Sequence, residues 1–183
     1  LELKGVNDLY AGRFQSAVDL LTQAGAALGK NALPADPFLS HINDCIDCDQ
    51  AAKRQVSYSK LSLARRLLEL SQKAEGAGAP AAQASFELAV GLYNMSAYGN
   101  VRRSYRTDHD YEPADKNMAV VERYAKRAME LASDKELKAK GCFLAAKAEQ
   151  SRYYAAQAER SGGGAGAEAV DSSVHSPVYF KRL

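Results

Sequence analysis

The chain has 183 residues and a formal net charge of +2, and 46% of its residues are hydrophobic against 25% charged. This composition is typical of a globular protein, and the small net charge argues against nucleic-acid or membrane binding through electrostatics alone. No apolar run approaches the roughly 20 residues of a spanning helix, so we expect no membrane insertion. Because Leu1 is not a Met start and helical patterning is already present there, we expect a fragment of a longer protein, without a visible signal peptide.

Apolar residues recur at helical spacing from the first residues onward. We expect a helix over 1–11, a break near Gly12, and a second helix over 14–28 that stops at Gly29. The second helix carries its apolar residues on one face: Phe14, Ala17, Val18, Leu21 and Ala24. This alternation of small, aromatic and large residues indicates two short antiparallel helices that pack closely against each other.

A long irregular segment, about 29–57, follows these helices and is the first of two expected insertions. It contains Pro34, Pro37, several Asp residues and two cysteines. Loops of this length within a compact domain are usually functional or are ordered by an additional constraint.

The rest of the chain is again helical in pattern, with no alternating Val/Ile/Thr runs that would predict strands. We expect helices over 59–74, 81–98, 113–132 and 136–159, with Pro80 in a first turn and an N-cap at Ser133-Asp134. The helix over 81–98 is apolar almost all round, which is typical of a helix sandwiched between others. The second insertion spans about 99–113, the Gly/Ala/Ser-rich stretch 161–173 is expected to be mobile, and a last helix is expected after Pro177.

Asp44-Cys45-Ile46-Asp47-Cys48-Asp49 is the one local constellation that suggests a function. A Cys-x-x-Cys pair brings two sulfurs close enough to share a zinc ion, form a disulfide or remain as unreactive thiols. His41 would be a third zinc ligand, but the sequence offers no defined fourth, and a βαβ context for redox chemistry is absent. The unreactive loop, the disulfide and the metal site therefore all remain open. Cys142, amid apolar residues, is expected to be a small buried hydrophobe.

The second insertion mixes basic and aromatic residues over 102–111. Such a mixture is found in proteins that bind single-stranded nucleic acid, but the chain lacks the strongly basic balance of that class. We favour a solvated loop in which the Arg residues pair with neighbouring acids. His109, between two Asp residues, has no nucleophile or further ligand placed with it. We therefore expect no nucleic-acid partner and no catalytic set.

The first two helices resemble one tetratricopeptide repeat, a helix-turn-helix unit with a period of about 34 residues. The matching small and aromatic positions are Gly5, Gly12, Phe14, Ala17, Leu21 and Ala24. Segments 81–98 and 124–132 resemble the two helices of a second repeat, and 136–159 resembles the first helix of a third. Lys4 stands where the family usually has a large aliphatic residue, the two insertions break the period, and the helix over 59–74 has no clear place. Loosely, Tyr93-Asn94-Met95 and the cysteine stretch are similar to large, uncharacterised bacterial helical-repeat proteins, a resemblance that implies an exported parent but no activity.

The tetratricopeptide resemblance implies an all-α fold: antiparallel helix pairs stacked as a short right-handed superhelix over 1–183, with two long insertions. It also implies a concave face, lined by the first helix of each pair, that binds peptides. The candidate partner-binding residues on that face are Asn94, Tyr98, Lys147, Gln150 and Tyr154. For the tyrosines, buried rings whose hydroxyls reach solvent are an equally good interpretation.

The sequence therefore predicts a non-enzymatic scaffold that binds a protein or peptide and needs no cofactor. Two alternatives remain: an assembly module of a larger exported bacterial protein, and a metal-binding protein that uses the Cys45/Cys48 loop. Because a repeat buries its face only against a neighbour, the open ends of the array are also expected to favour self-association.

Overall fold

The computed structural model describes residues 1–25, 32–39, 57–96, 99–101 and 117–160. Within these ranges the chain is entirely helical apart from turns and one irregular segment, which confirms the predicted all-α class. None of the described helices is both long and apolar enough to cross a membrane. The predictions for 161–173, for a helix after Pro177, and for the cysteine loop lie outside the described residues.

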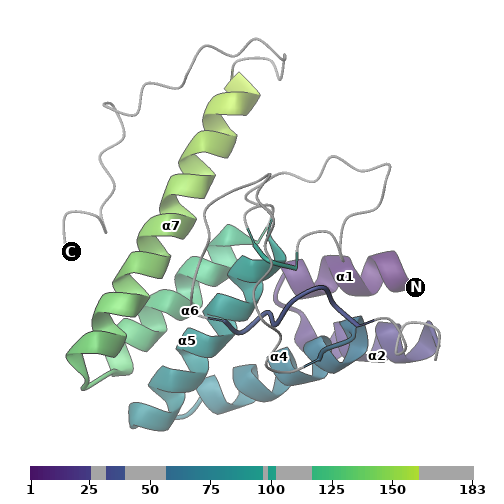
Figure 1. The fold of residues 1–183 in the computed structure, drawn as a ribbon, viewed down its shortest axis with the longest axis horizontal. Helices are drawn as coiled ribbons and strands as arrows, with labels where there is room; N and C mark the ends of the chain where they lie inside the picture. The colour runs from purple at the N-terminus through teal and green to yellow at the C-terminus, as the bar shows by residue number, and fades with distance from the viewer. Residues whose placement is uncertain (26–31, 40–56, 97–98, 102–116, 161–183) are drawn as a thin grey trace.

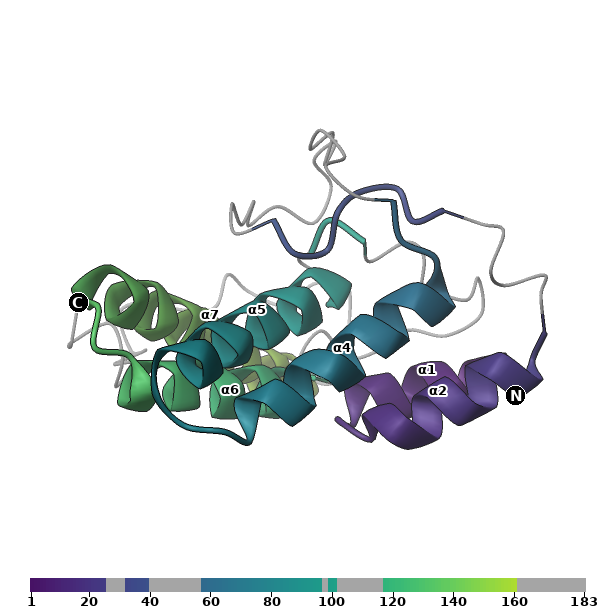
Figure 2. The ribbon, with the colours of Figure 1, turned by 90° about the horizontal axis from the view of Figure 1, so that it is seen from below.

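The helices follow one another in space in the order of the chain (Figure 1). They are α1 (Glu2–Tyr10), α2 (Phe14–Gln23), α4 (Lys60–Ala74), α5 (Gly78–Met95), α6 (Met118–Leu131) and α7 (Lys135–Arg160). In the described part, the substantial helix–helix interfaces join consecutive helices, and α5 additionally touches α7. Figure 2 shows the same order from below, with α1 and α2 at one end and α6 and α7 at the other. Repeat proteins pack in this nearly one-dimensional way.

The first two helices meet at a glycine, as the spacing predicted. A Cβ atom on Gly5 would lie 2.9 Å from Leu21 Cγ, so only a glycine permits this approach of α1 to α2. The turn between them uses Gly12 at φ +74°, a conformation that side chains disfavour. The buried residues of α2 are Phe14, Ala17 and Leu21, and these belong to the predicted face.

α5 is the central helix of the molecule. Thirteen of its 18 residues are buried, which confirms the expectation of a helix sandwiched between others. Pro80 lies in its first turn, where backbone N–H groups have no intrahelical acceptor and a proline costs little. Ser59 precedes α4 and forms a capping box with Ser62.

α6 and α7 form a helical hairpin at the C-terminal end of the described structure (Figure 1). The short turn carries Asp134, whose carboxylate accepts hydrogen bonds from the backbone N–H groups of Glu136 and Leu137, as predicted for an N-cap. A Cβ atom on Gly141 would lie 2.8 Å from Met129 Cγ, so a small residue again allows two helices to approach closely. Cys142 is buried, as expected.

Residues 32–39, within the first predicted insertion, lie against α5 in an irregular conformation (Figure 2). The side-chain amide of Asn94 donates to the backbone carbonyls of Pro37 (2.9 Å) and Leu39 (3.1 Å). The amide of Asn100 donates to the carbonyl of Asp36 (2.8 Å). Leu33 and Ala35 are buried. This segment is therefore an integrated part of the core rather than an appended loop.

Candidate partner-binding surfaces

One narrow stripe on α7 unites three of the five predicted binding residues. Lys147, Gln150 and Tyr154 follow Phe143 at spacings of four, three and four residues, which places all four side chains on one side of the helix. Buried neighbours such as Ala145 and Ala148 project from the other side of the helix. We call Phe143, Lys147, Gln150 and Tyr154 the α7 stripe.

The stripe combines an apolar ring with a partly desolvated cation. Phe143 is 39% exposed, and the ammonium of Lys147 lies 5.8 Å from the centre of its ring, within the range of a cation–π contact. Lys147 Nζ also donates to Gln150 Oε1 at 3.2 Å. Burial lowers the pKa of Lys147, because the surrounding protein replaces part of its hydration shell. Tyr154 packs edge-on against Tyr153, with ring centres 5.7 Å apart.

Asn94 does not belong to this surface. Its side chain is only 2% exposed, and its amide holds the 32–39 segment through the two hydrogen bonds described above. We expected this polar residue on an exposed face because the pattern of α5 alone did not show that another part of the chain covers it. Tyr98 lies outside the described residues, as do His41, Cys45, Cys48 and His109.

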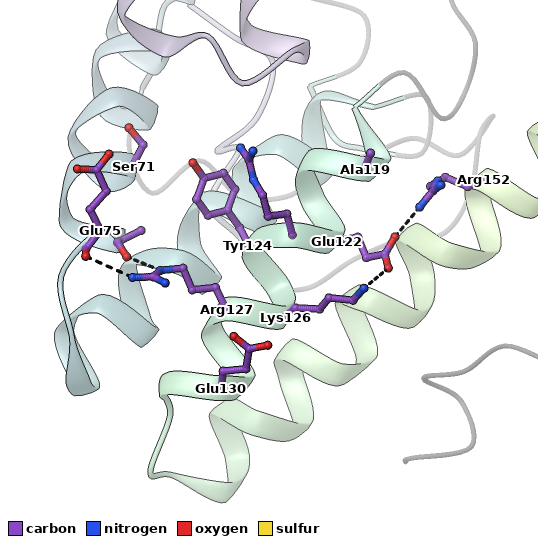
Figure 3. A pocket seen from close by; sticks show the side chains of 11 residues that line it. Ser71, Glu75, Ala119, Glu122, Tyr124, Lys126, Arg127, Glu130 and Arg152 are labelled. Atoms are coloured by element: carbon purple, nitrogen blue, oxygen red, sulfur yellow. Dashed lines mark hydrogen bonds and ion pairs between the residues drawn. The ribbon is translucent and has the colours of Figure 1, made fainter.

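A groove of about 730 Å³ lies between α4, α6 and α7 (Figure 3). The carboxylate of Glu122 on α6 forms ion pairs with Lys126 and with Arg152 of α7, each with an N–O distance of 2.7 Å. The guanidinium of Arg123 lies 4.8 Å from the centre of the Tyr124 ring. These five side chains of the groove wall therefore already neutralise or stack on one another.

Arg127 closes the end of this groove against α4 (Figure 3). Its guanidinium donates to the backbone carbonyls of Ala74 (2.6 Å), Glu75 (3.3 Å) and Gly76 (3.0 Å). The last carbonyls of a helix have no intrahelical donors and carry partial negative charge, so a cation is well placed there. The role of Arg127 is thus structural, joining α6 to α4.

A second pocket, of about 460 Å³, lies beside the 32–39 segment and is lined by α4, α5 and the start of α7. Its aromatic side chains are Phe38, Tyr58 and Phe86, and the rings of Phe38 and Tyr58 meet edge-on at 5.3 Å. Burial, reinforced by the negative charge of Asp36, raises the pKa of the Tyr58 hydroxyl above its ordinary value of 10.

Within the described ranges, no three His, Cys, Asp or Glu side chains are grouped so that they could hold a metal ion. What the described surfaces offer is recognition chemistry: apolar rings, ion pairs and cation–π contacts. Comparison with protein-family models, with curated proteins and with solved structures finds no match to this chain.

Several residues of these surfaces were not singled out from the sequence. Phe143 shares the spacing of the α7 stripe, and this signal could have found it. Arg127 carried no such signal, because the carbonyls that it contacts are 51 to 53 residues away. Asp36 carried none either, because the fold alone brings its segment against Asn100, 64 residues away.

Proposed function

We propose that this protein is a non-enzymatic interaction scaffold: helix pairs, stacked in the manner of tetratricopeptide repeats, that present a face to a protein or peptide partner. The observation that carries the proposal is the packing of the described helices in chain order. Such arrays bury a continuous core between neighbours and leave long lateral faces available for binding.

The face that we assign to the partner is the α7 stripe. α7 has 26 residues, which corresponds to about 39 Å, and its C-terminal end projects beyond α5 and α6 (Figure 1). An exposed aromatic ring next to polar groups that can exchange partners is typical of binding surfaces. No cofactor enters this proposal, because recognition through these side chains needs none.

The test is partner binding by the full chain, first identified by affinity capture and then measured with purified components. We expect the triple variant Lys147→Ala/Gln150→Ala/Tyr154→Ala to weaken binding by about tenfold or more. The matched control, Gln23→Ala/Glu130→Ala/Lys138→Ala, changes three exposed residues elsewhere, and we expect it to bind nearly as the unchanged chain does. Equal losses in both triple variants, with circular dichroism unchanged, would reject the α7 stripe. If affinity capture retains no protein beyond those that an unrelated bait of similar size also retains, the scaffold function itself is rejected.

Self-association remains a second mode of partner binding. Leu1 and Leu3 at the α1 end are 64% and 47% exposed, and covering them in a second copy would remove apolar surface from water. Sedimentation velocity over a range of concentrations tests this, since a mass that stays monomeric throughout would exclude it.

A further inference from the structure

The pocket beside the 32–39 segment contains a buried carboxylate, Asp36, that forms no ion pair with any other residue in the described part of the chain. Asp36 is 5% exposed and lines the pocket. Its Oδ1 accepts a hydrogen bond from the backbone N–H of Phe38 at 2.9 Å. Among the residues that the structure describes, no Lys, Arg or His forms an ion pair with it. A buried charge of this kind is costly unless a partner compensates it.

The other charged groups of the pocket are already matched. The Glu87 carboxylate forms an ion pair with Arg66 (N–O distance 3.0 Å), and that of Glu136 forms one with Lys140 (2.6 Å). Asp134 accepts a backbone hydrogen bond at the start of α7. The four carboxylates and two cations that line the pocket therefore leave an excess of negative charge, and Asp36 is the buried part of that excess.

Aromatic side chains complete the chemistry of the pocket. The faces of Phe and Tyr rings attract cations through their quadrupoles, and the attraction is stronger where water is excluded. Phe38 is held in place because its ring lies over Gly91, where a Cβ atom would come within 2.6 Å of Phe38 Cε1. Phe86 is 8% exposed. Phe38 and Asp36 are thus presented by the pinned 32–39 segment, Phe86 by α5, and Tyr58 by the residues just before α4.

We propose that this pocket binds a cationic side chain, lysine or arginine, of a partner protein segment, with Asp36 as the counter-charge and Phe38, Tyr58 and Phe86 as the aromatic walls. Charge complementarity selects this occupant over an acidic or purely apolar one. The inference rests on the proposed scaffold function and names the chemistry of one contact that the partner makes.

The test uses the full chain and three small probes: the Nα-acetyl N-methylamides of lysine, arginine and norleucine. Norleucine matches the lysine stem but has no charge. We expect lysine or arginine to shift the nuclear magnetic resonances of Phe38, Tyr58 and Phe86 in a saturable manner, with weaker binding at higher salt, and norleucine to have little effect. Comparing the two cationic probes determines which of them the pocket prefers.

Asp36→Asn is the decisive variant, because asparagine keeps an acceptor for the Phe38 N–H but removes the charge. We expect this variant to bind the cationic probes with an affinity lower by about fivefold or more. Asp19→Asn, which makes the same chemical change at an exposed carboxylate of α2 that does not line the pocket, is the matched control, with an expected change below about twofold. Absence of saturable shifts, shifts elsewhere, equal binding of norleucine, or unchanged binding by Asp36→Asn would each overturn the proposal.

This test separates the pocket from the scaffold. If the α7 stripe variant no longer binds the partner but the unchanged chain does not bind the cationic probes, only the pocket inference is wrong. If the cationic probes bind but no protein partner is ever retained, the scaffold function is wrong and the pocket is a small-cation site.

Discussion

At the residue scale, the turn between α1 and α2 is held by a buried carboxylate. Asp8 is 4% exposed, and it accepts hydrogen bonds from Ser16 Oγ at 2.5 Å and from Arg13 Nε at 3.0 Å. The hydrogen bond from Ser16, then that from Arg13, lowers the pKa of Asp8 below its ordinary value of 3.8. A carboxylate stabilised in this way favours the folded state when it is ionised.

We expect Asp8→Asn to lower the free energy of unfolding at neutral pH by about 2 kcal/mol, because charge-assisted hydrogen bonds become neutral or are lost. The folded pKa lies below the unfolded one, so the contribution of Asp8 is complete above pH 3.8 and disappears as the pH falls through the folded pKa. Urea denaturation at pH 7 and at acid pH measures both effects.

The difference between the unchanged chain and Asp8→Asn should therefore shrink as the solution becomes more acidic. Asp19→Asn is the control, because Asp19 bonds only to exposed Gln15 within the described part of the chain; we expect it to change the free energy by less than about 0.5 kcal/mol. A difference for Asp8→Asn that is independent of pH down to pH 2 would contradict this interpretation.

At this scale, the sequence allowed the surroundings of a residue to be predicted where its neighbours are close in the chain. The first two helices were expected to pack closely, and they do, with Gly5 against Leu21, because the short turn between them leaves few arrangements. Asn94 was placed on a surface and is buried, since its partners Pro37 and Leu39 belong to an insertion whose path has no periodic signal.

At the scale of elements, the C-terminal end of α4 is capped from a distant helix. Arg127 on α6 satisfies three carbonyls that follow or end α4, so the contact both completes α4 and fixes the position of α6 (Figure 3). Hydrogen bonds from a charged donor are each worth more than neutral ones.

We expect Arg127→Met, which keeps much of the aliphatic stem, to lower the free energy of unfolding by about 2 kcal/mol. Lys126→Met is the control on the neighbouring position, where the side chain is 43% exposed and its ammonium pairs with Glu122, and we expect a loss below about 1 kcal/mol. Urea denaturation compares the two. Equal free energies of unfolding for the two variants would show that the Arg127 contact stabilises the protein no more than the surface ion pair of Lys126 does.

The 32–39 segment is the second element that depends on one side chain. We expect Asn94→Ala to lower the free energy of unfolding by about 2–3 kcal/mol, because two backbone carbonyls lose their donor. Cleavage by a broad-specificity protease within 32–39 should accelerate in the same variant. Gln83→Ala, an exposed change on the same helix, is the control; cleavage of this segment at the same rate in both variants would refute the pinning role.

The existence and type of the described helices followed from periodicity. The ends of α1, α4 and α7 lie within one residue of the expected ones, but those of α2 and α5 do not. α2 was expected to reach residue 28 and is described only to Gln23, where Ala24 and Gly25 follow, the latter at φ +99°. α5 was expected over 81–98 and spans Gly78–Met95. After α2, two glycines that can each end a helix, Gly25 and Gly29, stand within a few residues, and local pattern alone does not rank them.

At the scale of the whole molecule, consecutive packing was predictable and the binding surface was not. Apolar faces with a period of 3.6 residues, joined by short turns, require each helix to pack on a neighbour. A face can bind a partner only if its side chains are exposed, and the exposure of α7 is set by how far this helix extends beyond α5 and α6 (Figure 1). The sequence placed Lys147, Gln150 and Tyr154 on one stripe by spacing alone, and their role as a binding surface stays a prediction.

The most direct test of the proposed array is residue-resolved hydrogen exchange on the full chain carrying Leu9→Ala. Leu9 is fully buried in α1, and its truncation should cost about 2–5 kcal/mol locally. If the helices are stacked as a repeat array, exchange should accelerate in α1 and α2 while α6 and α7 remain as protected as in the unchanged chain. An equal loss of protection in all described helices would show a single cooperative unit and would contradict the array.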